Sequence, residues 1–338
     1  MIKKINTGVL SYGMSGRVFH TPFLEASELF NLRAIVERNK KNAAADYPNI
    51  ISYDSVDELL ADEEIELVVV NTPNDTHYDF ANAALQAGKH ILVEKPLVPS
   101  SSQAEALFEL AKRAGKKIFT FHNRRFDSDF LSLKKVLEGN LVGDPIELHL
   151  RFDRYRPEIG PKVFKETNRP ASGVLYDLGS HLLDQAISLF GRPKAYYKVR
   201  SGHRDHTKVE DYGFILLEFD NQVTVHITTS LLVGDPQASF VLHGKNGSFI
   251  KPRSDVQEEQ LIAGMTPNDP LYGLEDKKNQ GKLIVLKDGN QAESSYLEAP
   301  KGEYMQLFNA VYESIRLDKP YFVKPEDIIT QLQILESV

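Results

Sequence analysis

The sequence predicts an α/β fold with an N-terminal parallel-sheet domain and a C-terminal α+β domain that has an open, mainly antiparallel sheet. In the first third, short β-branched apolar runs alternate with helical patterns, as in successive βαβ units. After residue 121 the alternation stops, and strand-like runs follow one another without helices. The length of 338 residues suits two domains that each bury a core. We therefore expect domains at 1–121 and 122–338.

The predicted parallel sheet has strongly apolar strands, and the helices between them have recognisable capping residues at their ends. Ser55 with Glu58, and Ser100 with Gln103, fit capping boxes at helix starts, while Gly88 and Gly115 fit helix ends. The expected strands are Ile5–Ser11, Leu32–Glu37, Leu67–Asn71, His90–Glu94 and Lys117–Phe121.

The second domain is expected to combine a few helices with consecutive strands. Helices are predicted over Asp129–Leu137 and around Tyr176–Phe190, and Lys251–Ala299 reads as a polar surface excursion. Turns such as Lys245-Asn246-Gly247 indicate antiparallel pairing. The expected strands are Ile146–Phe152, Ala195–Arg200, Tyr212–Phe219, Gln222–Ser230, Ala238–His243 and Ser248–Ile250, and two helices, about Glu303–Leu317 and Pro325–Glu336, close the chain.

Composition narrows the classes of partner. With 40 Lys and Arg against 47 Asp and Glu, and no long basic run, nothing favours nucleic acid or an anionic membrane surface. No run approaches the roughly 20 apolar residues of a spanning helix, and Met1–Thr7 is too short and polar for a signal-peptide core. The absence of cysteine excludes disulfides and thiolate catalysis. We expect a cytoplasmic protein with a small-molecule substrate.

A glycine loop follows the first strand. Ser11-Tyr12-Gly13-Met14-Ser15-Gly16 is a G-x-G-x-x-G pattern with serine in the first place. In a dinucleotide-binding Rossmann domain, such glycines let the backbone approach a pyrophosphate and the helix pack on the strand. By itself the motif also fits a tight turn without a ligand.

The residues after the second strand bear on the choice of cofactor. Glu37 lies 21 residues after Gly16, where an acid can bind the adenosine ribose hydroxyls, although it also fits a solvated strand end. Arg38 could instead bind a 2′-phosphate. The sequence therefore predicts NAD or NADP. The polar loop Asn71-Thr72-Pro73-Asn74-Asp75-Thr76-His77 ends another strand at the same edge of the sheet, so it is expected to contact the cofactor or to cap a helix.

Two further motifs could carry acid–base chemistry. Glu94-Lys95-Pro96 ends a strand, and Lys95 could act as acid, base or hydrogen-bond donor, or be a surface lysine beside a loop. Asp177 and His181 are four residues apart on a predicted helix and so share a face. His181 could accept a hydroxyl proton while Lys95 holds the developing oxyanion and Asp177 orients its neighbours. A structural His–Asp pair is the alternative.

These motifs occur in an order that resembles the Gfo/Idh/MocA oxidoreductases over nearly the whole chain. The order is the glycine loop, Thr72-Pro73-Asn74 with His77, Glu94-Lys95-Pro96, and Asp177-Leu178-Gly179-Ser180-His181. Three stretches look like the subgroup that contains NADP-dependent scyllo-inositol dehydrogenases: His122-Asn123-Arg124-Arg125-Phe126-Asp127, Asp153-Arg154-Tyr155-Arg156-Pro157-Glu158, and Tyr176 to His181. The departures are Ser11 in place of glycine, and Glu37, because the NADP-using subgroup often lacks the acid.

The resemblance implies hydride transfer between a nicotinamide cofactor and a hydroxyl or keto group of a polyol or sugar, inositol-like in kind. It implies that Lys95, Asp177 and His181 surround the reacting carbinol. Arg124 and Tyr155 are further candidate substrate residues, and Tyr155 could hydrogen-bond a substrate hydroxyl or simply pack. Glu94 and Asn123 join the glycine loop, Glu37, Arg38 and the Thr72 loop as cofactor residues. The resemblance also implies that the open sheet mediates assembly into a homodimer or homotetramer.

Several alternatives stay open. Asp177, His181 and Asp184 also fit a metal-binding face, but no second histidine stands at ligand spacing, so no metal is expected. A cluster of arginines could bind an anionic substrate, although nearby acids favour internal salt bridges; the arginines are Arg124, Arg125, Arg154 and Arg156. Competing functions are a non-catalytic cofactor-binding regulator and a reductase of an unrelated carbonyl substrate, of dihydrodiol or tetrapyrrole type.

Overall fold

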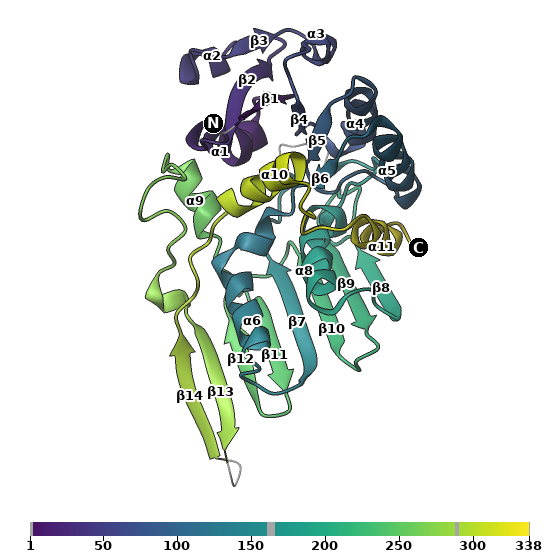
Figure 1. Cartoon of the computed structure of the whole chain (residues 1–338). Helices are drawn as coiled ribbons and strands as arrows, with labels where there is room; N and C mark the ends of the chain where they lie inside the picture. The colour runs from purple at the N-terminus through teal and green to yellow at the C-terminus, as the bar shows by residue number, and fades with distance from the viewer. Residues whose placement is uncertain (1–2, 161–165, 288–290, 338) are drawn as a thin grey trace. The chain divides into compact units, whose positions relative to one another are not determined.

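The computed structural model describes residues 3–160, 166–287 and 291–337 (Figure 1). The chain groups into two compact units. Unit 1 comprises Met1–His122, Glu258–Tyr272 and Tyr304–Leu332, and unit 2 comprises Asn123–Gln257, Gly273–Glu303 and Gln333–Val338. The division between His122 and Asn123 lies one residue from the predicted domain boundary. The later segments Glu258–Tyr272 and Tyr304–Leu332, which we expected in the second domain, instead group with unit 1. Residues 288–290 of the predicted polar excursion lie outside the described residues, as do 1–2, 161–165 and 338.

Unit 1 contains the predicted Rossmann sheet. Its six described strands are all parallel, in the order β3-β2-β1-β4-β5-β6. The strands are β1 (Ile5–Val9), β2 (Phe30–Val36), β3 (Ile51–Tyr53), β4 (Leu67–Val70), β5 (His90–Val93) and β6 (Ile118–Thr120). Strand β3 was not predicted, because this three-residue edge strand has no buried side chain and hence no hydrophobic pattern.

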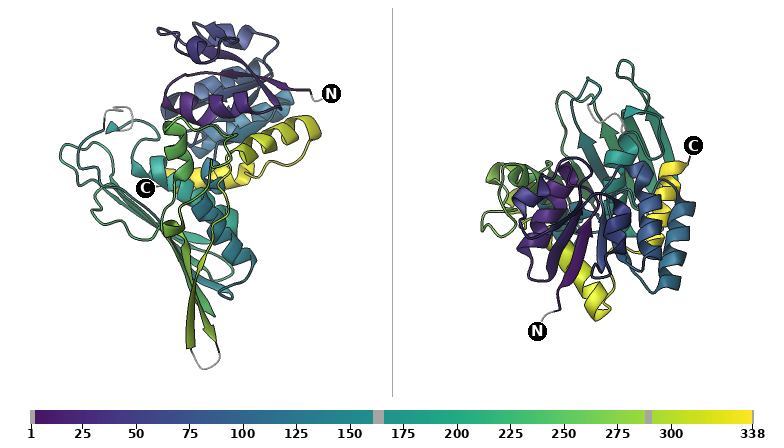
Figure 2. Two further views of the ribbon diagram at one scale, coloured as in Figure 1. Left: turned by 90° about the vertical axis from the view of Figure 1, so that its left-hand side faces the viewer. Right: turned by 90° about the horizontal axis from the view of Figure 1, so that it is seen from above.

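Helices lie on both faces of this sheet (Figure 2). The side chains of Ser55 and Ser100 accept hydrogen bonds from the N–H groups of Glu58 and Gln103, which confirms both predicted N-caps. Gly115 ends a helix with φ of 63°, a left-handed conformation that glycine adopts without strain. The helical segments of unit 1 are η1 (Gly16–His20), α1 (Thr21–Ala26), α2 (Ala43–Asp46), α3 (Val56–Ala61), η2 (Asn74–Thr76), α4 (His77–Gln86), α5 (Ser101–Ala114), residues 258–262 of α9 (Val256–Ile262), α10 (Met305–Leu317) and residues 325–332 of α11 (Pro325–Glu336).

Aromatic packing returns the C-terminal helix α10 to unit 1. Phe308 stacks on Phe23 with ring centroids 5.2 Å apart and contacts Phe121 edge-on at 5.9 Å. These three side chains are completely or almost completely buried. Lys117 on the adjoining loop donates to the carbonyl oxygen of Ser314 at 2.5 Å. Burial of its apolar face thus stabilises α10 in unit 1, although the helix lies far along the chain from the sheet strands.

Unit 2 contains an open sheet in the order β14-β13-β12-β11-β7-β10-β9-β8. Among the described strands, β7 and β10 are parallel neighbours and all other pairs are antiparallel, which confirms the mainly antiparallel prediction. The strands are β7 (Pro145–Asp153), β8 (Ala195–Ser201), β9 (Tyr212–Glu218), β10 (Thr224–Ser230), β11 (Phe240–Gly244), β12 (Gly247–Lys251), β13 (Gly281–Lys287) and β14 (Gln291–Leu297).

The expectation that Lys251–Ala299 is only a surface excursion was wrong. This stretch contains α9, the short helix η5 (Lys277–Asn279), and the strands β13 and β14, which form a hairpin at the edge of the sheet (Figure 1). In β14 all residues but the last are exposed, so the strand lacks the alternation of buried and exposed side chains on which the prediction relied.

Helices cover one face of the sheet of unit 2. Helix α6 (Ser128–Glu138) packs on β11 and β12, and α8 (Ser180–Phe190) packs on β7 and β10. Side chains on the helix-covered face of β9, such as Ile215 and Leu217, are fully buried, whereas Phe214 and Leu216 on the opposite face are half-buried. Side chains along β9 therefore alternate between a buried face and a half-buried face. No helix in the described part of the chain is long and apolar enough to cross a membrane.

Candidate active site

In the glycine loop of unit 1, Gly16 is closely surrounded by other atoms, whereas Gly13 has free space beside it. A side chain at Gly16 would place its Cβ 2.2 Å from the carbonyl oxygen of Ser11, so only glycine fits there. The amide of Asn71 donates to the same carbonyl oxygen at 2.8 Å. At Gly13 a Cβ would meet only the Ser11 hydroxyl, at 3.5 Å. This geometry fits the two roles that a dinucleotide-binding loop needs: close helix packing at Gly16 and free space over Gly13.

Glu94 links the glycine loop to the strand that carries the candidate lysine. Its carboxylate accepts a hydrogen bond from the Ser15 hydroxyl and pairs with His20 Nε2 at 2.9 Å. The backbone N–H of Lys95 donates to its other oxygen at 3.3 Å. Burial raises the pKa of Glu94, but the bonds from His20 and Ser15 outweigh it and lower the pKa to about 2. The ionised carboxylate therefore binds three protein groups around the loop.

Lys95 follows β5 and is half-buried, and the Lys95–Pro96 peptide bond is cis. In the neighbouring loop, His77 Nδ1 lies 2.9 Å from the carbonyl oxygen of Pro96, and His77 Nε2 lies 2.9 Å from that of Thr72. The His77 side chain is completely buried, and this desolvation lowers its pKa. A ring so enclosed cannot contact a cofactor in this conformation. We expected His77 among the cofactor residues, whereas its structural action is to join the Thr72 loop to the Lys95 loop.

Glu37 turns into the fold rather than toward solvent. One carboxylate oxygen accepts from the backbone N–H of Ala43 at 3.0 Å, and the other accepts from the Ser52 hydroxyl at 3.1 Å. Glu37 is only 6% exposed, whereas the next residue, Arg38, is exposed. The charge that the end of β2 presents to solvent is therefore positive, although the sequence suggested a carboxylate for the ribose.

Two other loop residues lie at the surface of unit 1. The Tyr12 hydroxyl donates to Asp46 Oδ2 at 2.5 Å, and its ring meets Tyr47 edge-on. Burial and the bond to Asp46 raise the pKa of Tyr12. Met14 is exposed.

In unit 2, the candidate catalytic pair lies where two helical geometries meet. Asp177 is half-buried within η4 (Leu175–Gly179), a π-helical turn, and His181 lies in the first turn of α8, 5% exposed. The sequence predicted one continuous α-helix here. A single π-turn inside a helix is a feature often found at functional sites. A similar π-turn, η1, starts at Gly16 in unit 1.

The arginines near this helix form internal salt bridges. The Arg125 guanidinium binds Asp184 with two hydrogen bonds of 2.7 Å, and Arg124 donates to Asp127 at 3.1 Å and to Asp255 at 2.8 Å. Arg124 is buried in the short helix η3 (Asn123–Phe126), as is Asn123. The structure thus supports the salt-bridge alternative for these two arginines. Because Arg125 engages both oxygens of Asp184, the alternative metal face loses its third ligand.

The other predicted substrate residues differ in exposure. Tyr155 is 65% exposed, and Arg156 is exposed. The Arg154 guanidinium lies 4.9 Å from the centroid of the Phe152 ring. Lys95 belongs to unit 1, while Arg124, Tyr155, Asp177 and His181 belong to unit 2.

Two family models match the two halves of the chain. Residues 5–122 match the Gfo/Idh/MocA "Oxidoreductase family, NAD-binding Rossmann fold", and residues 134–338 match the "Oxidoreductase family, C-terminal alpha/beta domain". The chain belongs to the Gfo/Idh/MocA family of oxidoreductases. Its cofactor is accordingly NAD or NADP.

Several relatives extend over the full length of this family member. It is 32% identical to scyllo-inositol 2-dehydrogenase (NADP(+)) IolW of Bacillus subtilis, over 99% of this chain and 93% of the relative. It is 36% identical to the uncharacterized oxidoreductase YhhX of Escherichia coli, over 98% and 95% of the two chains. A solved structure of an oxidoreductase from Bacillus cereus matches with a TM-score of 0.91 and 32% identity, over 98% and 95% of the chains.

One group of polar side chains in unit 2 was not predicted from the sequence. Glu147 and His149 on β7 lie beside His226 on β10. The spacing Glu-x-His on a strand places both side chains on one face and could have drawn attention to them, but which strand lies beside β7 is not readable from local sequence.

Proposed function

We propose that this oxidoreductase is an NADP-preferring dehydrogenase that oxidises a hydroxyl group of a polyol or sugar, of inositol type, to the corresponding ketone. The observation that carries the proposal is the full-length similarity to a scyllo-inositol 2-dehydrogenase (NADP(+)), in a chain that has Lys95, Asp177 and His181 at the places where the family motifs occur. The reaction is reversible, and the cofactor, when bound, supplies the hydride acceptor or donor.

The charges at the end of β2 support the proposed preference for NADP. A free carboxylate at Glu37 would repel a 2′-phosphate, but both of its oxygens accept hydrogen bonds from Ala43 and Ser52 inside the fold. Arg38 is exposed beside it. A guanidinium can bind a phosphate with two parallel hydrogen bonds. The pyrophosphate would lie over Gly13, where the backbone is open.

The proposed chemistry assigns one task to each polar side chain. His181 accepts the proton of the reacting hydroxyl, the Lys95 ammonium stabilises the oxygen as negative charge develops on it, and Asp177 orients the neighbouring groups. Glu94 is a positioning residue, because its carboxylate binds both the loop residue Ser15 and the backbone of Lys95.

The test measures formation of reduced cofactor by absorbance with a panel of inositols and aldoses. Lys95→Ala should lower kcat by about 10²–10³, because the lost charge acts mainly on the transition state. His181→Ala should lower kcat by about 10²–10⁴ and remove one limb of the pH profile. The control is His203→Ala, which removes a histidine that instead bonds Ser201. Wild-type kcat in either variant, with cofactor saturating, would remove that residue from the mechanism.

The same panel separates the competing functions. A chain that binds NADPH tightly but turns over no substrate would be a regulator, and one that reduces only dihydrodiol-type or tetrapyrrole-type substrates would belong to the other alternative. For the cofactor, Arg38→Ala should lower kcat/KM with NADP much more than with NAD. Arg113→Ala, an exposed arginine at the end of α5, should change neither. Equal losses with both cofactors would show that Arg38 does not bind the 2′-phosphate.

We also propose that the protein forms a homodimer or homotetramer through the face of the unit 2 sheet that the helices leave uncovered. Phe214 and Leu216 lie on this face and are half-buried rather than buried. Covering apolar side chains on such a face with a second copy removes them from water and so stabilises the assembly. A cytoplasmic location agrees with this assignment.

A further inference from the structure

Two histidines and a glutamate meet on the uncovered face of the unit 2 sheet. Glu147 and His149 are two residues apart on β7, so both side chains point to this face. His226 on β10 is the register partner of His149. Because β7 and β10 run parallel, the backbone brings the two histidines side by side, next to the glutamate.

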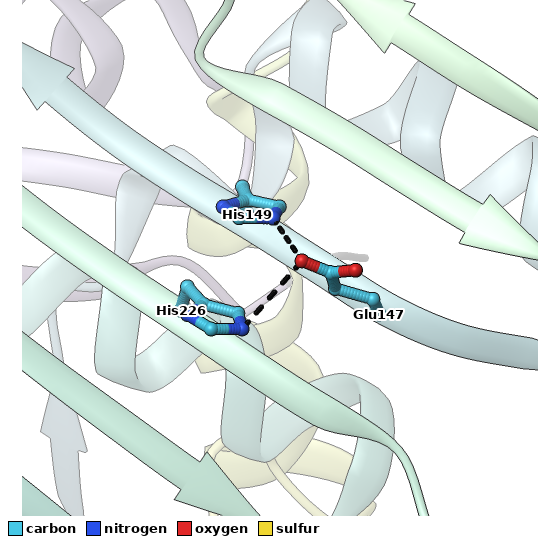
Figure 3. A group of neighbouring side chains, drawn as sticks. All are labelled: Glu147, His149 and His226. Atoms are coloured by element: carbon cyan, nitrogen blue, oxygen red, sulfur yellow. Dashed lines mark hydrogen bonds and ion pairs between the residues drawn. The ribbon is translucent and has the colours of Figure 1, made fainter.

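The side chains converge on one point. The two imidazole rings are stacked, with centroids 4.5 Å apart and planes at 9°. Both Nε2 atoms face the same oxygen of Glu147: His149 is hydrogen-bonded to it, and His226 Nε2 lies 3.6 Å away (Figure 3). Among the residues that the structure describes, these are the ones whose potential metal-ligand atoms form a group, all within 4.8 Å of one another.

We propose that Glu147, His149 and His226 form a binding site for a divalent transition-metal ion, with Zn²⁺ as the preferred ion. Two imidazoles and one carboxylate form a donor set that zinc uses with a fourth ligand such as water. Ligand atoms around tetrahedral zinc are about 3.3 Å apart, given bonds of about 2.0–2.1 Å. The pairing of β7 with β10 holds the backbone of the three donors in place, and the two imidazole planes, now nearly parallel, turn toward each other when both rings bind one ion.

The donor types also determine which ions are excluded. Mg²⁺ and Ca²⁺ prefer sets of oxygen ligands, whereas imidazole nitrogen suits zinc and its neighbours. In the single chain the side chains are half-buried, with 35%, 39% and 27% of His149, Glu147 and His226 exposed. An ion can therefore reach them before a second copy covers this face, and an enclosed water would supply the fourth ligand in the assembly. A bound ion would connect β7 to β10. This site lies wholly within unit 2 and is independent of the proposed dehydrogenase chemistry.

The test uses untagged, full-length protein in its native assembly, freed of metal with a chelator and dialysed. Calorimetric titration with Zn²⁺ should saturate at one ion per chain, and Mg²⁺ should give no binding. His149→Gln and His226→Gln should each weaken Zn²⁺ binding by at least about tenfold, since even loss of an outer partner of a metal ligand costs about 10–100-fold. Co²⁺ should give visible absorption typical of tetrahedral coordination in the wild type and lose it in both variants.

His243→Gln is the matched control. His243 lies on β11, on the same face and opposite Glu147, but its Nδ1 is hydrogen-bonded to the Ser248 hydroxyl at 2.8 Å. This variant should bind Zn²⁺ as the wild type does. The proposal is overturned if the wild type binds no stoichiometric Zn²⁺, if both glutamine variants bind it unchanged, or if His243→Gln weakens binding equally, which would indicate a diffuse histidine-rich surface. Far-UV circular dichroism establishes that each variant is folded.

Discussion

Replacing Gly16 by alanine should damage the fold of unit 1, whereas replacing Gly13 should damage only cofactor binding. At Gly16 the new Cβ would lie 2.2 Å from the Ser11 carbonyl oxygen and 3.0 Å from Asn71 Nδ2. Since the first contact is backbone, the turn between β1 and η1 has to open. Overpacking of this kind costs about 1–3 kcal/mol, and loss of the Asn71 to Ser11 hydrogen bond adds about 1 kcal/mol. We expect the free energy of unfolding to fall by about 2–4 kcal/mol.

Gly13→Ala provides the internal comparison. Its Cβ would lie 3.5 Å from the Ser11 hydroxyl, an ordinary contact, so stability should change by no more than about 0.5 kcal/mol. The methyl group would nevertheless occupy the space over the loop and weaken cofactor binding by about tenfold or more, or about 1.4 kcal/mol. Urea unfolding measures the first effect, and titration with NADPH fluorescence measures the second. Equal stability of the Gly16→Ala variant and the wild type would refute the close approach, and unchanged titration of the Gly13→Ala variant would refute the location of the pyrophosphate.

Three further predictions follow from the charged and apolar contacts. The pKa of Glu94 is lower in the folded protein than its ordinary value. Glu94 therefore stabilises the fold above pH about 4.5, and this contribution disappears as the pH falls toward about 2. Glu94→Gln should make the free energy of unfolding less dependent on pH in this range, whereas Glu105→Gln, at an exposed position on α5, should leave the dependence unchanged. Asp184→Asn should lower the free energy of unfolding in urea by about 3–5 kcal/mol, because it removes the charge of a buried carboxylate that binds the Arg125 guanidinium with both oxygens. A loss below about 1 kcal/mol would contradict this. Leu216→Glu should shift sedimentation toward the monomer, and a wild type that sediments only as a monomer would remove the proposed interface.

Local sequence was sufficient for most of the fold because its signals act over a few residues. Apolar strands such as Leu67–Val70 are buried on both faces, and the caps at Ser55 and Ser100 depend only on residues three positions away. The order of motifs along the chain was likewise enough to indicate the family. The exposed strand β14 and the short edge strand β3 were missed for the same reason, because neither buries enough apolar surface to leave a pattern.

The direction of side chains and the contacts between distant segments were decided by tertiary structure. Glu37 follows a strand at the position where a carboxylate can bind the cofactor ribose. Its carboxylate instead accepts hydrogen bonds from Ala43 and Ser52 inside the fold, while Arg38 is exposed. The ring nitrogens of His77 lie 2.9 Å from two backbone carbonyl oxygens, and Glu94 is bound by residues 79 and 74 positions away along the chain. His149 and His226 become neighbours only because β10 pairs with β7. Such partners are chosen by the packing of the whole unit, because burial leaves a polar side chain stable only where another segment supplies its hydrogen bonds.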